Sequence, residues 1–377
     1  MKIGIFCPYD MFKSGGVQEH IIALQQGLIK RGHNSIIITP QPRKYEGEIP
    51  SGMIFVGASR DFKSPLHTVV QVSMSLNGDA LEEVFEREKF DVLQIHEPWI
   101  PIVSRQLLTR SNAVNVGTFH ARLPDTRVSK TLEKVITPYT RSILKYIDVF
   151  TAVSKPASQY LQQLSDIQPQ IIPNGVDLTK YKQVISATNI HPTIFYVGRL
   201  EKRKGLKYLL RAFKLLRESI PDVELLIGGN GPDREKLEEL TQEESIHGVT
   251  FLGYLSDAEK ITHMQKADVF CSPALYGESF GIVLLEALAC GKPVVAGANP
   301  GYAGVLQGKG AMGLVNPKDT VEFARRLQLF LTDKDLQELL TDWALEYVKQ
   351  YDYEQIVDQY EKLFLQIKSN PKRDTKS

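Results

Sequence analysis

Two carboxylates in the second half of the chain have the spacing of a ligand site. Glu278 and Glu286 stand eight positions apart, directly after an apolar run at residues 269–273 that is typical of a buried strand. The intervening Gly-Glu-Ser-Phe-Gly sequence predicts a glycine turn and then the start of a helix. The free amide groups at such a helix start attract anions, and two helical turns bring Glu286 to the side of Glu278. The pattern therefore suits a phosphorylated, hydroxyl-rich ligand.

A second loop contributes cations. The strand predicted at residues 193–197 leads into Gly-Arg-Leu-Glu-Lys-Arg-Lys-Gly at 198–205, which contains Arg199 and Lys204. Arginine offers a planar two-pronged donor and lysine a compact charge, so this pair could neutralise a departing diphosphate without a metal ion. The alternative is a solvated basic turn without a ligand.

Three loops of the first half could also carry chemistry. Gly15 and Gly16 open a predicted helix at residues 17–30, where they could admit a phosphate or sugar or serve only the backbone. His96 and His120 each close a predicted strand, at residues 92–96 and 116–120. A single strand-end histidine is commonly structural, and these two show no metal-ligand spacing with a third residue. We therefore predict no metal ligand here.

The elements that must position these residues alternate along the whole chain. Apolar strand-like runs alternate with helix-period segments, which predicts parallel sheets in an α/β fold. The pattern restarts after a polar connector, so we expect two Rossmann-like, doubly wound domains, at 1–173 and 174–352, with a cleft between them. A helix at residues 353–367 is expected to pack back on the first domain, and a polar tail completes the segment 353–377.

Composition narrows the class of protein. The chain has 377 residues and a formal charge of +1, which makes nucleic acid an improbable partner. Its three cysteines lack CxxC spacing and are expected to be buried free thiols. We predict a cytoplasmic protein, with any membrane contact peripheral, on the cytoplasmic face. The basic, amphipathic residues 121–145 could form a membrane-surface helix or an ordinary helix of the first domain.

Taken together, the motifs resemble the retaining nucleotide-sugar glycosyltransferases of family 4 type, which have the GT-B fold. The motifs that carry this resemblance are Gly15-Gly16-Val17-Gln18-Glu19-His20, Gly117-Thr118-Phe119-His120, Pro173-Asn174-Gly175-Val176-Asp177, residues 198–205, and Gly277-Glu278-Ser279-Phe280-Gly281 with Glu286. Within that family the chain is most similar to the bacterial phosphatidylinositol mannosyltransferases, through Cys7-Pro8-Tyr9 and His96-Glu97-Pro98. The resemblance covers nearly the whole chain.

The resemblance implies transfer of a hexose, with mannose from GDP-mannose favoured, to an acceptor hydroxyl with retention at the anomeric carbon. The acceptor would be phosphatidylinositol or another lipid or glycan. No cofactor is required, and Mg²⁺ is possible but not implied. The implied catalytic residues are His120, Arg199, Lys204 and Glu278. The implied donor-binding residues are Gly15, Gly16, Arg199, Lys204, Leu255, Glu278, Ser279, Phe280, Gly281, Ile282 and Glu286, and the implied acceptor-binding residues are Tyr9, Gln18, Trp99 and Arg203.

Two departures from the subfamily lie on the acceptor side. Residues 81–90 are net acidic where the subfamily has a basic helix, and Trp99 stands where it has a polar asparagine. A transferase that uses UDP-glucose or UDP-GlcNAc on another acceptor is therefore an alternative. Alternatives of other classes are a nucleotide-sugar epimerase and a non-catalytic two-lobed binding protein. A dinucleotide-dependent oxidoreductase is disfavoured, because no Gly-x-Gly-x-x-Gly follows the first strand.

Overall fold

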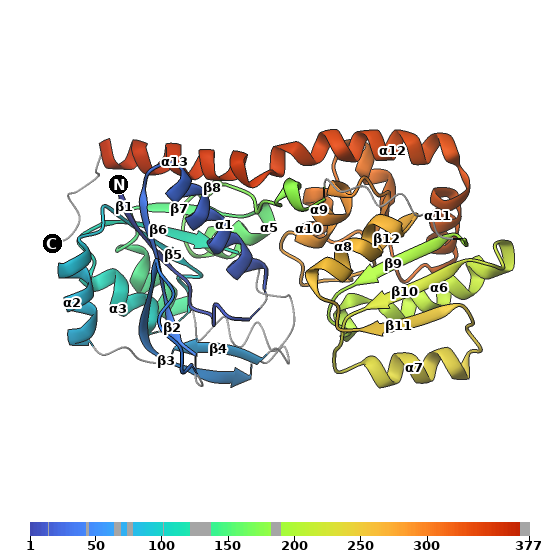
Figure 1. The fold of residues 1–377 in the computed structure, drawn as a ribbon, viewed down its shortest axis with the longest axis horizontal. Helices are drawn as coiled ribbons and strands as arrows, with labels where there is room; N and C mark the ends of the chain where they lie inside the picture. The colour runs from blue at the N-terminus through green and yellow to red at the C-terminus, as the bar shows by residue number, and fades with distance from the viewer. Residues whose placement is uncertain are drawn as a thin grey trace. The chain divides into compact units, whose positions relative to one another are not determined.

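The chain forms two compact units in a computed structural model that describes residues 1–13, 15–42, 45–63, 69–73, 78–100, 102–120, 137–181 and 190–369. The first unit comprises Met1–Asn174 together with Tyr353–Ser377, and the second comprises Gly175–Asp352 (Figure 1). The boundary predicted from the sequence, after Pro173, lies one residue before this division. Most of the basic segment 121–145 lies outside the described residues.

The first unit contains an eight-stranded sheet in the order β4-β3-β2-β1-β5-β6-β7-β8. Its strands are β1 (Lys2–Phe6), β2 (Asn34–Gln41), β3 (Met53–Lys63), β4 (Val69–Ser73), β5 (Val92–His96), β6 (Val114–Phe119), β7 (Val149–Ala152) and β8 (Gln170–Ile171). Its labelled helices are α1 (Gly16–Lys30), α2 (Gly78–Glu88), α3 (Val103–Arg110), α5 (Lys155–Leu164) and α13 (Tyr353–Ser369). All strand pairs are parallel except β3 with β4. The sequence analysis did not predict β3 and β4.

The helix α13 packs on α1 although the two are separated by most of the sequence (Figure 1). Tyr360 and Phe364 of α13 are fully buried in one apolar cluster with Ile3 and Ile5 of β1. Arg31, just beyond α1, pairs with Glu361 at 2.6 Å. The predicted return of the last helix to the first domain is confirmed.

The second unit contains a six-stranded parallel sheet in the order β11-β10-β9-β12-β13-β14. Its strands are β9 (Thr193–Val197), β10 (Glu224–Gly228), β11 (Val249–Gly253), β12 (Val269–Ser272), β13 (Val294–Gly297) and β14 (Leu314–Val315). Its helices are α6 (Leu206–Ser219), α7 (Arg234–Glu243), α8 (Asp257–Lys266), α9 (Ile282–Ala289), α10 (Pro300–Val305), α11 (Thr320–Thr332) and α12 (Lys334–Tyr347), and its short 3₁₀ segments are η1 (Leu178–Tyr181), η2 (Lys202–Lys204), η3 (Gly308–Gly313) and η4 (Val348–Tyr351). This strand order is the doubly wound Rossmann order, as predicted from the alternating pattern.

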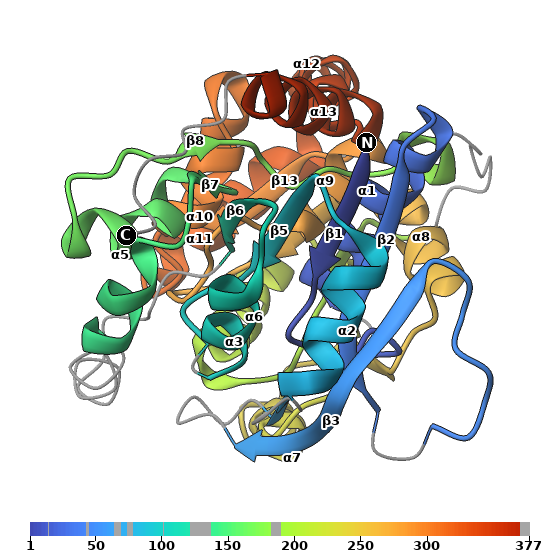
Figure 2. The same ribbon diagram turned by 90° about the vertical axis from the view of Figure 1, so that its left-hand side faces the viewer.

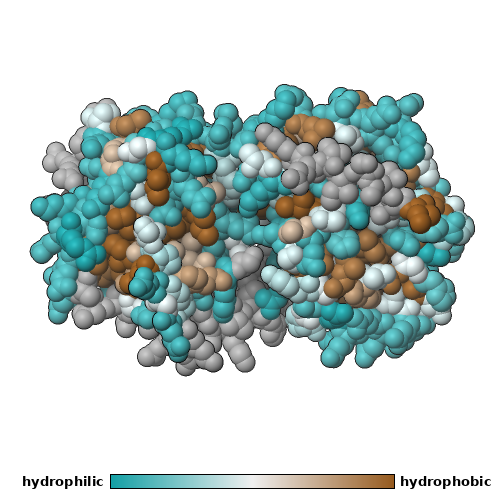
Figure 3. Space-filling model, in the orientation of Figure 1, coloured by the Kyte–Doolittle hydropathy of each residue, from teal (hydrophilic) through white to brown (hydrophobic). Residues whose placement is uncertain are grey.

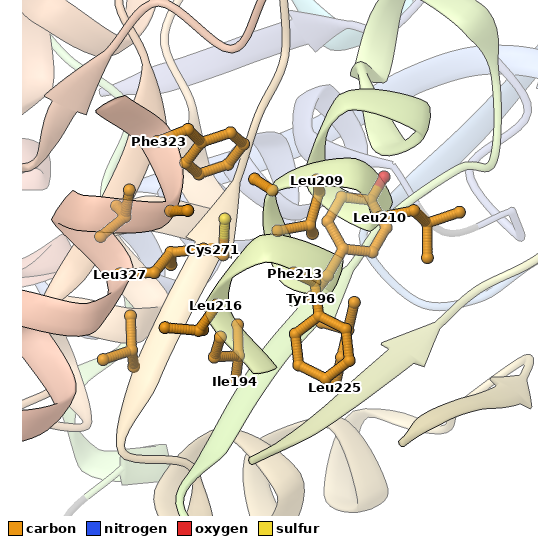
Figure 4. Packing of buried hydrophobic residues seen from close by; sticks show 14 of the residues in the cluster. Ile194, Tyr196, Leu209, Leu210, Phe213, Leu216, Leu225, Cys271, Phe323 and Leu327 are labelled. Atoms are coloured by element: carbon orange, nitrogen blue, oxygen red, sulfur yellow. The ribbon is translucent and has the colours of Figure 1, made fainter. Parts of the chain in front are cut away.

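Apolar side chains fill both faces of the second sheet. On one face Ile194 and Tyr196 of β9 meet Leu209 and Phe213 of α6, together with Phe323 of α11 (Figure 4). All five are at most 1% exposed. Strands buried on both faces explain the continuous apolar runs that the sequence shows here.

Hydrophilic residues cover most of the face drawn in Figure 3, and hydrophobic residues form separate patches among them. Among the described residues, no helix combines the length and apolar character needed to cross a membrane.

Candidate active site

The strand order of the second unit reverses between β9 and β12, which lie side by side. Ligands of open α/β sheets bind beyond the carboxyl ends of strands at such a point. The loops that follow these two strands are joined by a hydrogen bond from Leu275 N to Arg203 O at 2.8 Å. Gly205 has φ +74°, and a Cβ there would lie 2.2 Å from the carbonyl oxygen of Pro273. A glycine is therefore required for the two loops to approach this closely.

Glu278 lies at the centre of a charge cluster in these loops. Its Oε1 is 2.8 Å from Lys204 Nζ and 2.5 Å from Nη1 of Arg203. Arg203 also pairs through Nε with Glu201 at 2.7 Å, and Arg199 Nε lies 3.6 Å from the same side chain. Burial alone would lower the pKa of the Arg203 guanidinium, but the carboxylates of Glu278 and Glu201 together raise it above its ordinary value. The two loops thus bring Arg203, Lys204 and Glu278 together in one ion-paired cluster.

Helix α9 begins immediately after this cluster. Gly281, its N-cap residue, has φ +112°, and a Cβ there would lie 2.7 Å from the Tyr302 ring. Phe280 is buried, while Ser279 and Ile282 are half-buried beside it. The sequence therefore predicted the turn correctly. The amide groups at the start of α9 add partial positive charge next to Glu278.

Glu286, on α9, is held from two sides through a single oxygen. Lys260 Nζ of α8 lies 2.7 Å from Glu286 Oε1, and the Tyr181 hydroxyl donates to the same oxygen at 3.2 Å. Sequence reasoning missed both partners because they lie 26 and 105 positions away. Leu255, also half-buried, packs against Gly228 at the end of β10. The donor-site residues predicted in the second half of the chain thus follow the carboxyl ends of β9, β11 and β12.

The first unit contains a cluster of three histidines. His96 ends β5, His120 follows β6, and His20 comes from α1. The strands β5 and β6 are neighbours in the sheet (Figure 2). His96 Nδ1 and His120 Nε2 lie 2.7 Å apart, and the His20 ring contacts both imidazoles edge-on at 5.3–5.7 Å between centroids. Burial lowers the pKa of all three, for His20 to about 4. At neutral pH all three rings are therefore uncharged.

The potential of this cluster to bind a metal ion is limited by its own hydrogen bond. One nitrogen from each ring lies within 4.8 Å of the others, which is the spacing of a three-histidine set. The His96–His120 hydrogen bond, however, already uses one nitrogen of each ring. Within the described residues neither nitrogen of His20 has a hydrogen-bond partner that would orient it as a ligand. The sequence analysis did not identify His20 as the third member, since α1 is remote in sequence from both strands.

Glu97 is a buried carboxylate next to this cluster. Its Oε1 accepts a hydrogen bond from the backbone N–H of His120 at 3.2 Å, and its Oε2 accepts one from the indole of Trp99. Glu97 has φ +52°, a strained value for a non-glycine residue. Its charge also adds to burial in raising the pKa of the Tyr9 hydroxyl well above its ordinary value. Trp99, an expected acceptor residue, thus has its polar atom engaged by a neighbouring side chain.

The remaining predicted residues of the first unit lie on the loop before α1 and in the first turn of that helix. Gly15 is the N-cap residue of α1, and Gly16 begins the helix. Gln18 Nε2 donates to the backbone carbonyl of Asp10 at 3.2 Å, so this side chain folds over the loop. Tyr9 is half-buried on the same loop. Arg203, also expected to contact the acceptor, lies in the second unit, where it bonds to Glu278.

Comparison with known proteins identifies the family. Residues 14–180 match the family described as Glycosyltransferase Family 4, and residues 179–346 match Glycosyl transferases group 1. The chain is 31% identical to a phosphatidyl-myo-inositol mannosyltransferase of Mycobacterium leprae over 97% of this chain and 96% of that protein. The chain is a family 4 glycosyltransferase. The enzyme of the same name from Mycolicibacterium smegmatis is 33% identical, over 94% of this chain and 90% of the other.

Solved structures agree on the fold of this glycosyltransferase. Sucrose-phosphate synthase from Thermosynechococcus elongatus superposes with a TM-score of 0.77 at 22% identity, covering 98% of this chain and 99% of that one. Anabaena HepE, solved in complex with UDP-glucose, gives a TM-score of 0.74 at 18% identity, covering 97% and 100%. The fold is therefore of the GT-B class. Family membership makes the protein a hexosyltransferase, as the motifs predicted.

Proposed function

We propose that this glycosyltransferase transfers mannose from GDP-mannose to an acceptor hydroxyl with retention of the anomeric configuration. The observation that carries the proposal is the cluster in which Lys204 and Arg203 hold Glu278 beside the start of α9. It combines cations for a diphosphate with a carboxylate for sugar hydroxyls.

The chemistry follows from these charges. Cleavage of the bond between sugar C1 and the diphosphate oxygen places negative charge on the leaving group, which Arg199, Lys204 and the first amides of α9 stabilise. Glu278 accepts hydrogen bonds from sugar hydroxyls, and Glu286 accepts them from the ribose. We propose that these groups act without a bound metal ion.

A front-side substitution accounts best for retention. The acceptor oxygen bonds to C1 on the face that the diphosphate leaves, and the acceptor proton passes to the departing phosphate oxygen. Double displacement would need a free carboxylate as nucleophile. The buried Glu97 does not meet this need, because its two oxygens accept hydrogen bonds from His120 and Trp99. We assign His120 a contact with the transferred sugar.

Two observations bear on the acceptor. The names of the relatives indicate phosphatidyl-myo-inositol, and a lipid acceptor would place the reaction at a membrane surface with peripheral contact. Helix α2, however, carries five acidic residues and one basic residue, and an anionic bilayer repels such a helix. Trp99 also presents an aromatic ring whose N–H is already bonded. These features favour, as a second candidate, the same transfer to a glycan or another lipid that is not anionic.

The donor is tested first. The full chain is incubated with a panel of nucleoside-diphosphate sugars, and thermal unfolding identifies those that stabilise it. Product anomers are then assigned by NMR. Arg199→Ala and Lys204→Ala should each reduce turnover by about 10²-fold, as loss of one donor to a developing anion does. The control is Lys318→Ala, an exposed lysine of the same unit.

The outcomes separate the alternatives. Unchanged turnover in both cation variants, or an inverted product, would contradict the mechanism. Conversion of the donor without any acceptor would instead indicate an epimerase. Vesicles that contain phosphatidylinositol, compared with neutral vesicles that carry a glycolipid and with soluble glycans, distinguish the two acceptor candidates.

A further inference from the structure

The hydrogen bond between His96 and His120 restricts which ring nitrogens of the two histidines can carry a proton. The two rings come from neighbouring parallel strands, β5 and β6, whose register pairs His96 with Thr118. His96 is fully buried and His120 is 7% exposed. Both rings are neutral at pH 7, so each carries one N–H and one lone pair. In the 2.7 Å contact between His96 Nδ1 and His120 Nε2, one nitrogen donates and the other accepts.

Only two arrangements are possible. If His120 Nε2 donates, the proton of His96 must sit on Nε2, and His120 Nδ1 carries a lone pair. If His96 Nδ1 donates, His96 Nε2 carries the lone pair, and His120 has its proton on Nδ1. Two groups therefore bear on the tautomer of His120. One is the second nitrogen of His96, and the other is the side chain of Asn174, whose hydrogen bond with His120 raises the pKa of that imidazole against the stronger effect of burial.

The second nitrogen of His96 is buried without a partner. Among the described residues, His96 Nε2 makes no hydrogen bond. Buried N–H groups without an acceptor are rare in folded proteins, whereas acceptors that lack a donor are tolerated somewhat better. The arrangement with a lone pair on His96 Nε2 is therefore the more stable one, and its counterpart is a protonated Nδ1 on His120.

We propose that His96 is a positioning residue that fixes His120 as the Nδ1–H tautomer, so that His120 offers a hydrogen-bond donor to an oxygen of the transferred sugar. This inference rests on the proposed contact between His120 and the sugar. It makes His120 a neutral donor and excludes Nδ1 as a general base. Glu97 supports the arrangement, because it accepts the backbone N–H of His120 and holds the end of β6 in place.

A pair of nearly isosteric variants tests the tautomer. Asparagine at position 96 can place an N–H near the position of Nδ1, whereas aspartate can only accept. Long-range ¹H–¹⁵N correlation spectra of histidine-labelled full-length protein distinguish the two tautomers, and the His120 signals are assigned by their loss in His120→Gln. We expect Nδ1–H in the wild type and in His96→Asn, and a switch to Nε2–H or to the doubly protonated ring in His96→Asp.

Activity provides a second measurement. His96→Asp should lower kcat at least tenfold more than His96→Asn does, with similar donor KM values for the two variants. An Nε2–H tautomer in the wild type would overturn the inference, and so would identical His120 spectra in the two variants. If aspartate prevents folding, the wild-type spectrum alone still decides. The protein could also show the Nδ1–H tautomer and yet transfer no sugar. That result would contradict the proposed function, but it would still support the inference about His96.

Discussion

Lys260 Nζ and Glu286 Oε1 lie 2.7 Å apart, and Tyr181 donates to the same carboxylate oxygen. Both partners restrain one oxygen of the residue to which we assign the ribose. Lys260→Met removes the charge and keeps most of the apolar stem, so the carboxylate loses its orientation. We expect the donor KM to rise roughly tenfold, which corresponds to the loss of about 1.4 kcal/mol of binding, with a smaller change in kcat. Steady-state kinetics measure this, with Lys318→Met as the exposed control.

On the proposed mechanism, Glu278 competes with the diphosphate of the donor for Lys204. In Glu278→Gln, Lys204 loses its carboxylate partner at 2.8 Å, and Arg203 keeps its ion pair with Glu201. We therefore expect a nucleoside diphosphate to bind more tightly, while sugar transfer falls by about 10²-fold because the sugar loses a charged acceptor. Calorimetry and the transfer assay report the two effects. A parallel loss of diphosphate affinity would show that Glu278 instead supports the diphosphate site.

The buried histidine cluster predicts the direction of the pH dependence of stability. His20 contacts His96, His120, Tyr353 and Tyr360, and its pKa of about 4 lies below its ordinary 6.5. The unfolded chain therefore binds the proton first as pH falls. Above pH 6.5 this histidine does not affect the free energy of unfolding. As the pH falls from 6.5 towards the folded pKa, the free energy of unfolding decreases by up to about 1.4 kcal/mol per pH unit for one such group.

His20→Phe should flatten this slope. Phenylalanine keeps an aromatic ring in the pocket and has no proton to bind. Thermal unfolding of both proteins between pH 6.5 and 5 is the measurement. Paired carboxylates such as Glu88 and Glu361, whose pKa values are lowered, act only at more acidic pH, near and below their ordinary 4.5. If stability falls equally steeply with decreasing pH in the wild type and in His20→Phe, His20 is not the source of the pH dependence.

Gly27 of α1 lies against Val357 of α13. A Cβ at Gly27 would lie 2.4 Å from a methyl group of Val357, a stiff β-branched side chain. We expect Gly27→Ala to lower the free energy of unfolding by about 1–3 kcal/mol, despite the better helix propensity of alanine. Val357→Ala should relieve the clash, so the double variant should be more stable than the sum of the two single changes predicts. Additive effects in denaturant titrations would argue against this contact.

Much of the architecture could be predicted from periodicity. Strands β5 and β9 match the predicted apolar runs residue for residue, and β12 ends one residue before the end of the run predicted at 269–273. The hairpin of β3 and β4 was missed because its sequence mixes apolar and polar residues without regular alternation, and because its pairing with β2 shifts register. Pattern reasoning detects buried strands well and edge strands poorly, since edge strands bury only part of their surface.

The candidate site was predictable only in part. Glu278, Glu286, Arg199 and Lys204 could be found because they lie in short loops next to recognisable strands. Their partners could not, since the contact between Lys260 and Glu286 joins two different helices and depends on side-chain reach. His20 and His96 meet only because α1 follows β1, the strand next to β5. No local sequence pattern predicts a contact between these two side chains.

The position of α13 also has a consequence for synthesis. The apolar cluster on that side of the first unit contains Ile3 and Ile5 from the beginning of the chain and Ile356, Tyr360 and Phe364 from near its end. During translation this apolar surface of the N-terminal half stays exposed to solvent until the second unit and then α13 have emerged from the ribosome. A nascent chain stalled before residue 353 would thus be a natural client for chaperones that bind exposed hydrophobic segments.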